Sequence, residues 1–171
     1  MRPIVLTSLS KPMGAATDIQ PLVEAVQSLN AEDAYRARLS SDQWRMLASY
    51  LTRHDIRAGD LLIQQNDRER TMYLLEQGSL QVFLKRGTPG ANRIAILRPG
   101  SAVGEPALFG DAPRMANVEA ISPCVVWALR GPRLEELAAR LPALALEVLR
   151  AAGAVLAVRM RANMERNIPV S

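Results

Sequence analysis

The chain has 171 residues, with one histidine and one cysteine, and carries a formal net charge of +4 at pH 7. This length suffices for one domain with a buried core, whereas one histidine and one cysteine cannot build a structural zinc site, and Cys124 alone cannot form an intramolecular disulfide. Basic residues are interleaved with acidic ones, as in Arg68-Glu69-Arg70, so we do not expect a nucleic-acid-binding surface.

The first 16 residues contain Pro3, Pro12 and Gly14 and show no sustained periodicity, which predicts a flexible arm over residues 1–16. The apolar run near the amino terminus is too short for a secretory signal, and no later stretch reaches membrane-spanning length without charge. We therefore expect a soluble, cytoplasmic protein with no membrane span.

Residues 17–55 are predicted to form amino-terminal helices. Apolar residues recur at helical spacing from Ile19 to Leu29, and a second helix is expected to begin near Ser40, which has capping-box spacing to Gln43. His54 is expected at the end of a helix, as a surface residue.

Residues 56–130 change to short β-rich runs separated by turns rich in glycine, asparagine and proline. The predicted strands are Leu61–Ile63, Met72–Leu75, Leu80–Leu84, Arg93–Leu97 and Cys124–Leu129. Evenly spaced short strands of this kind favour an antiparallel barrel or jelly roll.

Residues 131–166 are predicted to be helical again, with Pro132 opening one helix and Pro142 opening another that runs to about Asn163. The fold class is therefore α+β, a β-roll flanked by helices. The last helix is apolar on more than one face, so it either lies wedged between the roll and the amino-terminal helices or forms a coiled-coil-like dimer seam.

The segment from Gly104 to Ala120 combines residues that suit a cyclic nucleotide. Gly104 would let the backbone approach a ligand, Glu105 would accept a hydrogen bond from the ribose 2′-hydroxyl, and a short helix from Ala107 to Gly110 would direct its amino-terminal end at the phosphate. Arg114 would bind the phosphate through its guanidinium group. The alternative is a Glu105–Arg114 salt bridge with no ligand.

This segment resembles the phosphate-binding cassette of cyclic nucleotide-binding domains, such as those of cyclic-AMP-dependent kinase regulatory subunits and the catabolite activator family. The matching residues are Gly104, Glu105, Ala107, Leu108, Pro113, Arg114, Ala116 and Val118. The similarity covers about residues 40 to 160 and implies an eight-stranded roll whose final helix closes over the base. The cyclic-nucleotide-binding residues that it implies are Gly104, Glu105, Ala107, Arg114, Met115 and Ala116.

Three positions depart from the family pattern. Pro106 removes one backbone donor beside the phosphate, although the Ala107 amide remains. Met115 lacks the hydroxyl that often contacts the ligand, which weighs against cyclic GMP. Asn66 stands at a turn where glycine is common, and asparagine tolerates the left-handed conformation expected there.

The resemblance implies a regulatory protein that senses cyclic AMP, in which ligand binding moves the carboxy-terminal helix and thereby controls a protein partner or a homodimer formed through terminal helices. Arg159, Arg161 or Asn163 would contact the base from that helix. We expect no helix-turn-helix domain, because few residues follow this helix, and no enzymatic activity, because the chain has no convincing pairing of nucleophile and base.

Two alternatives remain open at this stage. The fold could serve as a protein interaction module that binds no ligand. It could also bind cyclic di-GMP, whose second phosphate would need another arginine, such as Arg93 or Arg98.

Overall fold

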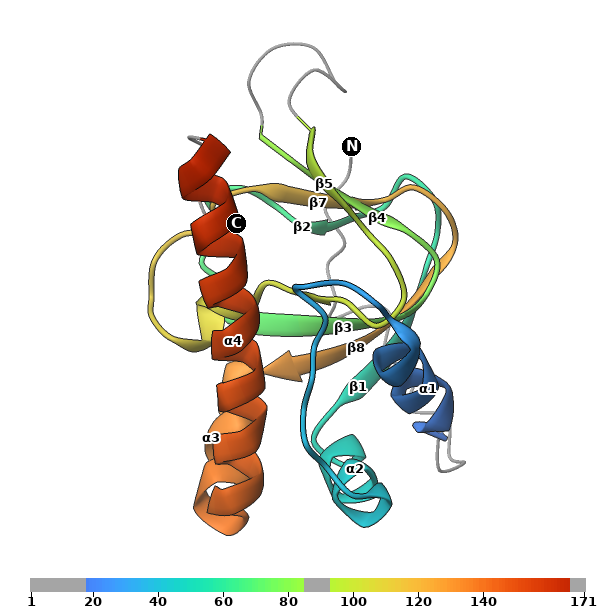
Figure 1. Cartoon of the computed structure of the whole chain (residues 1–171), viewed down its shortest axis with the longest axis vertical. Coiled ribbons are helices and arrows are strands. Elements are labelled where there is room, and N and C mark those ends of the chain that lie inside the picture. The colour runs from blue at the N-terminus through green and yellow to red at the C-terminus, as the bar shows by residue number, and fades with distance from the viewer. Residues whose placement is uncertain (1–17, 85–92, 167–171) are drawn as a thin grey trace.

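A computed structural model describes residues 18–84 and 93–166 of the chain. Eight strands form two antiparallel four-stranded sheets that face each other as a roll, with helices around it (Figure 1). The predicted α+β roll is confirmed, while the arm predicted over residues 1–16 lies outside the described residues.

One sheet has the order β1-β8-β3-β6 and the other has the order β2-β7-β4-β5. The strands of the first are β1 (Thr52–Ile56), β3 (Thr71–Gln77), β6 (Ala102–Val103) and β8 (Cys124–Arg130). Those of the second are β2 (Leu61–Ile63), β4 (Leu80–Phe83), β5 (Arg93–Leu97) and β7 (Asn117–Ala120). All five predicted strands are present, and β1, β6 and β7 are additional.

The described helices are α1 (Gln20–Ser28), α2 (Ser41–Ala48), η2 (Glu105–Leu108, a 3-10 helix), α3 (Gly131–Arg140) and α4 (Pro142–Arg166). Ser40 and Gln43 form the predicted capping box at the start of α2. Pro132 and Pro142 both lie in the first turns of their helices, where a missing N–H breaks no helical hydrogen bond. Among residues 18–84 and 93–166, no helix combines the length and the apolar character needed to cross a bilayer.

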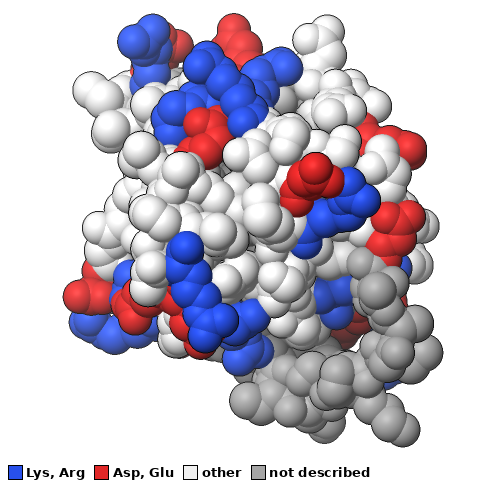
Figure 2. All heavy atoms as spheres, turned by 90° about the horizontal axis from the view of Figure 1, so that it is seen from below, with Lys and Arg blue, Asp and Glu red and all other residues white. Residues whose placement is uncertain are grey.

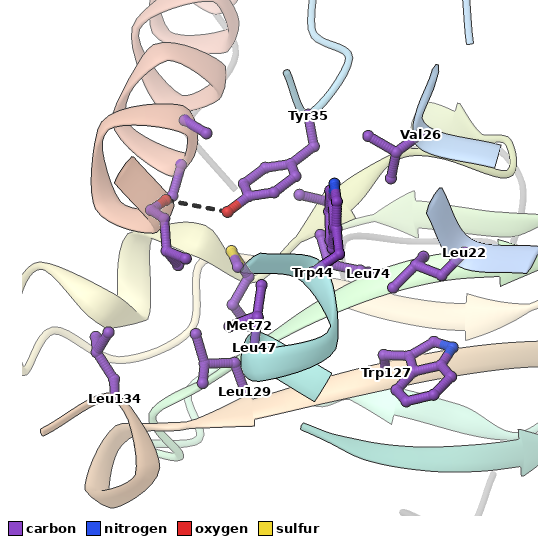
Figure 3. Close-up of a cluster of buried hydrophobic side chains, with 14 of the residues drawn as sticks. Leu22, Val26, Tyr35, Trp44, Leu47, Met72, Leu74, Trp127, Leu129 and Leu134 are labelled. Carbon is purple, nitrogen blue, oxygen red and sulfur yellow. Dashed lines mark hydrogen bonds between the residues drawn. The ribbon is translucent and has the colours of Figure 1, made fainter. Parts of the chain in front are cut away.

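Strands β3 and β8 separate two hydrophobic clusters, because their side chains alternate between the two faces of the sheet. Met72 and Leu74 point into a cluster shared with the helices, whereas Tyr73 and Leu75 point into the interior of the roll. Figure 3 shows the helix-side cluster, where Trp44 of α2 and Trp127 of β8 are both buried. The two strands therefore form the centre of the molecule.

Tyr35 ties the segment after α1 to α4. Its side chain is fully buried, and its hydroxyl donates a hydrogen bond to the backbone carbonyl oxygen of Val148 at 3.1 Å (Figure 3). Burial raises the pKa of the Tyr35 hydroxyl, so it remains a neutral donor at physiological pH. This bond holds the amino-terminal half of α4 to the segment after α1.

His54 corrects one sequence-based expectation. It lies in β1 rather than at the end of a helix, and only 3% of it is exposed. The predicted end of the amino-terminal helical region, residue 55, falls inside this strand. Pairing of β1 with β8 turns His54 and Ile56 inward, and this tertiary contact overrides the weak local pattern.

Candidate functional site

The cassette begins with a left-handed turn at Gly104, whose φ is +79°. The 3-10 helix η2 follows at once, with Pro106 in its first turn, and replaces the short helix expected from Ala107 to Gly110. The Ala107 amide donates to the Gly104 carbonyl oxygen at 3.2 Å, so this amide is engaged within the turn in the structure described. At the neighbouring β2–β3 turn, Asn66 has a φ of 72°, which is the left-handed conformation expected for this residue from the sequence.

Arg114 reaches back from the segment before β7 to the start of the cassette. Its guanidinium group donates to the carbonyl oxygens of Gly104 at 3.0 Å and Thr71 at 2.6 Å. Arg114 is only 7% exposed, and burial lowers the pKa of its guanidinium group. Within the described part of the chain no carboxylate forms a salt bridge with it, and its Nε has no hydrogen-bond partner. Among the described residues, the site thus holds a buried cation that no carboxylate contacts directly, although the negative charges of Glu69, Asp67 and Glu105 act on it from farther away.

Glu105 pairs with α4 rather than with Arg114. Its Oε2 accepts a hydrogen bond from Arg159 at 3.0 Å, and Arg159 also donates to Asp33 at 2.9 Å. The Glu105–Arg114 salt bridge considered from the sequence is therefore wrong. Arg159 instead joins the cassette, the carboxy-terminal helix and the loop after α1.

Glu105 itself is fully buried, and its Oε1 has no hydrogen-bond partner among the described residues. Burial raises the pKa of this carboxyl group, and the positive charge of Arg159 opposes that rise. A buried carboxylate oxygen without a donor is costly, so it favours any ligand hydroxyl that can reach it.

A cavity of about 70 Å³ opens between η2 and the Arg114 segment. Five of the six predicted binding residues line it, namely Gly104, Ala107, Arg114, Met115 and Ala116, and Glu105 is the exception because it points toward Arg159. Met115 is 46% exposed, so it lies at the rim and is not a core residue.

A second cavity of about 210 Å³ lies between α4 and the β4–β5 pair. Its lining includes Val82, Ala95, Val103, Arg159 and Asn163, and Val103 also lines the cassette cavity. Of the three residues expected to face a base, Arg159 and Asn163 line this cavity, whereas Arg161 is exposed and does not. Binding pockets for small molecules usually measure roughly 300–1,000 Å³, so a nucleotide would need both cavities.

Charged side chains of both signs are mixed on the surface of the described residues (Figure 2). Figure 2 shows basic and acidic side chains side by side on the face of the molecule that it presents. Several of the arginines are paired, such as Arg133 with Glu136 and Arg150 with Glu147. Six of the described arginines form salt bridges with carboxylates, so part of the positive charge is balanced locally.

Comparisons with known proteins identify the class to which this fold and cassette belong. The family model described as the cyclic nucleotide-binding domain matches residues 53–140, and the chain belongs to this family. This family is regulatory and binds nucleotides rather than catalysing a reaction.

Among individual proteins, a cAMP-dependent protein kinase regulatory subunit from Blastocladiella emersonii is 33% identical over 53% of this chain. The chain covers only 23% of that relative's length. A cyclic nucleotide-binding domain from Methylobacillus flagellatus KT superposes with a TM-score of 0.75 and 23% identity, over 94% of this chain and 88% of that one. The Thermus thermophilus catabolite activator protein gives a TM-score of 0.65 with 27% identity, over 76% of this chain and 60% of that one.

Proposed function

We propose that the chain is a regulatory sensor of cyclic AMP. The observation that carries this proposal is the buried guanidinium group of Arg114, which has two carbonyl partners and, among the described residues, no carboxylate in direct contact. A buried charge without a partner of opposite sign is unfavourable, and a singly charged phosphodiester in the cassette cavity would supply that partner. The match to a cAMP-dependent kinase regulatory subunit supports cyclic AMP as the ligand.

The remaining parts of the ligand fit the neighbouring groups. The ribose 2′-hydroxyl would donate to the carboxylate of Glu105, whose Oε1 lacks a donor. The base would enter the second cavity, against Val82 and Ala95 on one side and α4 on the other. Met115 at the rim offers no hydroxyl group, which favours adenine over guanine.

Cyclic di-GMP fits these residues less well, because its second phosphate needs a second arginine. Arg93 is exposed and donates twice to Gln81, and neither Arg93 nor Arg98 lines either cavity. Among the described residues, Arg114 is the one arginine that lines the cassette cavity, and Arg159 in the second cavity is already paired with Glu105 and Asp33, so a mononucleotide with one phosphate matches this site.

Signal transmission in this proposal runs through Arg159. In the structure described, Arg159 pairs with Oε2 of Glu105 and thereby holds α4 to the cassette, whereas Oε1 is the oxygen that a ribose hydroxyl would approach. A hydroxyl on Oε1 would share the carboxylate charge with Arg159, weaken this pair and shift the carboxy-terminal half of α4, and a partner or second subunit would respond to that shift. The role is sensing rather than catalysis.

Isothermal titration of the full chain, freed of carried-over nucleotide, with cyclic AMP, cyclic GMP and cyclic di-GMP tests the proposal. We expect micromolar or tighter binding of cyclic AMP and a loss of about 30-fold or more in Arg114→Ala, since cutting one member of a desolvated charged pair costs roughly 2–5 kcal/mol. Arg45→Ala, an exposed arginine paired with Asp42 on α2, is the matched control and should bind like the wild type.

Three results would contradict this assignment in different ways. Absence of heat and of thermal shift with all three ligands would favour a ligand-independent interaction module. Binding lost in Arg93→Ala as well as in Arg114→Ala would favour cyclic di-GMP. Equal cyclic AMP affinity in wild type and Arg114→Ala would show that Arg114 does not bind the phosphate.

A further inference from the structure

A third cavity, of about 440 Å³, lies between α4, the end of α1 and the segment that follows α1. Among the described residues, this α1–α4 groove shares no lining residue with the cassette cavity, and it meets the second cavity at Glu32 and Val158. Its volume lies within the range of roughly 300–1,000 Å³ that is usual for small-molecule sites. The nucleotide site proposed above does not use it.

The floor of the α1–α4 groove is apolar. Val26 of α1 and Ala151 and Val155 of α4 form it, and the least buried of them, Val26, is only 5% exposed. Ala154 and Val158 continue this apolar surface along α4, over about 10 Å from Ala151 at a rise of 1.5 Å per residue. The alanines keep the helix surface low, so an apolar chain of about that length can lie along it.

One wall of the groove is the extended segment after α1, and it is fixed to α4. Three hydrogen bonds hold it there: from the Tyr35 hydroxyl to the Val148 carbonyl oxygen at 3.1 Å (Figure 3), from the Arg38 amide to Glu147 at 2.7 Å, and from Arg150 to the Arg36 carbonyl oxygen at 3.0 Å. The groove is therefore present without a ligand, and binding there would need little reorganisation.

The exposed rim of the groove is basic. Arg36, Arg38 and Arg150 line it and are exposed, and Glu32 is the one acidic residue of the described lining. Arg150 pairs with Glu147, whose charge also acts on Arg38 from farther away. Among the described residues neither Arg36 nor Arg38 forms a salt bridge, and the guanidinium group of Arg36 donates to one backbone carbonyl oxygen.

The combination of floor and rim selects a class of ligand. An apolar floor favours an apolar body, because burying polar groups there without partners would be costly. Two guanidinium groups without a carboxylate partner favour an anion, and a carboxylate matches the planar fork of an arginine. A cation would be repelled by the rim, and a small anion without an apolar body would leave the floor uncovered.

We propose that the α1–α4 groove binds a small amphipathic carboxylate. Its alkyl chain lies along α4 over Ala151, Ala154 and Val158, and its head group is held at the rim by Arg36 and Arg38. The two sites are separate, so this proposal does not rest on the proposed nucleotide function.

Isothermal titration of the nucleotide-free full chain with decanoate tests the groove. We expect saturable one-to-one binding of decanoate. Acetate, which lacks the chain, and decyltrimethylammonium, which has the chain but the opposite charge, should not bind. Absence of decanoate binding, or equal binding of decanoate and decyltrimethylammonium, would overturn the proposal.

The head-group contact is tested by removing the two arginines. Arg36→Ala/Arg38→Ala should weaken decanoate binding by at least about tenfold, because charge-assisted hydrogen bonds to the carboxylate are lost. The matched control is Arg57→Ala/Arg98→Ala, which removes two exposed arginines outside the groove and should bind like the wild type. Equal losses in the two double variants would mean that only net charge matters, which would contradict a site at Arg36 and Arg38.

The position of the chain is tested by filling the groove. Ala154→Trp should abolish decanoate binding, whereas Ala157→Trp, also exposed on α4 but not part of the groove lining, should leave it unchanged. Circular dichroism of both variants checks that α4 remains folded. Arg114→Ala should also bind decanoate like the wild type, and decanoate binding that is lost in Arg114→Ala but kept in the groove variants would place the ligand in the cassette and overturn the proposal.

Discussion

Gly104 is the residue on which the position of Arg114, the proposed phosphate ligand, depends. Its φ of +79° lies in the left-handed region, and a Cβ there would stand 2.7 Å from the Arg114 Nη1 and 2.8 Å from the Thr71 carbonyl oxygen. A side chain at this position therefore meets both backbone strain and the guanidinium group itself.

Gly104→Ala should lower the free energy of unfolding by about 1–3 kcal/mol and weaken cyclic AMP binding, because strain and displacement of Arg114 act together. Gly110→Ala is the matched control, since a Cβ at Gly110 has no heavy atom within 4 Å and should change neither quantity. Urea denaturation and calorimetric titration of both variants provide the measurement. Unchanged affinity for cyclic AMP in Gly104→Ala would show that this glycine does not determine the geometry of the binding site.

His54 predicts a pH dependence of stability. It is 3% exposed, neither ring nitrogen has a hydrogen-bond partner among the described residues, and burial lowers its pKa below 6.5. The folded state thus favours the neutral ring, so the unfolded state takes up the proton first as the pH falls. The contribution of His54 to the free energy of unfolding is therefore largest above pH 6.5 and decreases as the pH falls below that value. The decrease ends once the pH is below the pKa of His54 in the folded state.

The slope from this one residue cannot exceed about 1.4 kcal/mol per pH unit, the value of one proton. His54→Leu should remove this part of the decline between pH 7 and pH 5, which urea midpoints measured along the series would show. A wild type and a variant with parallel pH profiles would mean that protonated His54 is accommodated in the folded state.

At the scale of elements, Arg159 adds an ion pair to the apolar packing of α4 against the cassette. Arg159 pairs with the fully buried Glu105 and with Asp33, whereas Arg161, two residues further along the same helix, is exposed. Comparing substitutions at Arg159 and at Arg161 therefore separates two effects. One is the loss of the contact with Glu105 and Asp33, and the other is the loss of one positive charge from α4.

Arg159→Met should destabilise the protein by about 3–5 kcal/mol, because it leaves a buried carboxylate without its cation. We also expect faster hydrogen exchange over the carboxy-terminal half of α4 without ligand, and a smaller change on adding cyclic AMP than in the wild type. Arg161→Met should behave like the wild type in both respects. If α4 responds to cyclic AMP equally in all three proteins, the signal does not pass through Arg159.

The sequence predicts those elements that have strong local patterns. The helices and the five glycine-bounded strands are of this kind, as is the cassette, whose predicted residues other than Glu105 line one cavity. Strand β1 was missed because its sequence TRHDI is mostly polar, and it exists through pairing with β8. Likewise β6 has only two residues, too few to show alternation.

The partner of Glu105 could not be predicted for a related reason. Arg159 lies 54 residues away on another element, and Asp33 is 126 residues from Arg159. The spacing of residues along the chain does not reveal contacts at such separations. The sequence therefore indicated only that Arg159 belongs to a helix expected near the ligand. The same limit explains why the Glu105–Arg114 salt bridge had to stay open as an alternative until the structure showed Arg159 as the partner of Glu105.

For the whole molecule, the two hydrophobic clusters share the strands β3 and β8 and should therefore unfold together. Both tryptophans, Trp44 and Trp127, lie in the helix-side cluster, so tryptophan fluorescence reports that cluster alone. Leu80 is fully buried in the roll cluster, and Leu22 is fully buried in the helix-side cluster. Substituting each of these two leucines thus tests whether destabilising one cluster also destabilises the other.

Leu80→Ala should cost about 2–5 kcal/mol and shift the fluorescence and far-ultraviolet circular dichroism midpoints equally, although the tryptophans lie in the other cluster. Leu22→Ala, the same substitution at an equally buried leucine, should likewise shift both probes together. Denaturant titrations followed by the two probes on the same samples make the comparison. If Leu80→Ala shifts circular dichroism but leaves the fluorescence midpoint in place, the roll and the helices unfold separately, and β3 and β8 do not join them into one cooperative unit. A cooperative molecule would instead allow a ligand in the cassette to stabilise the helices and the roll by the same amount.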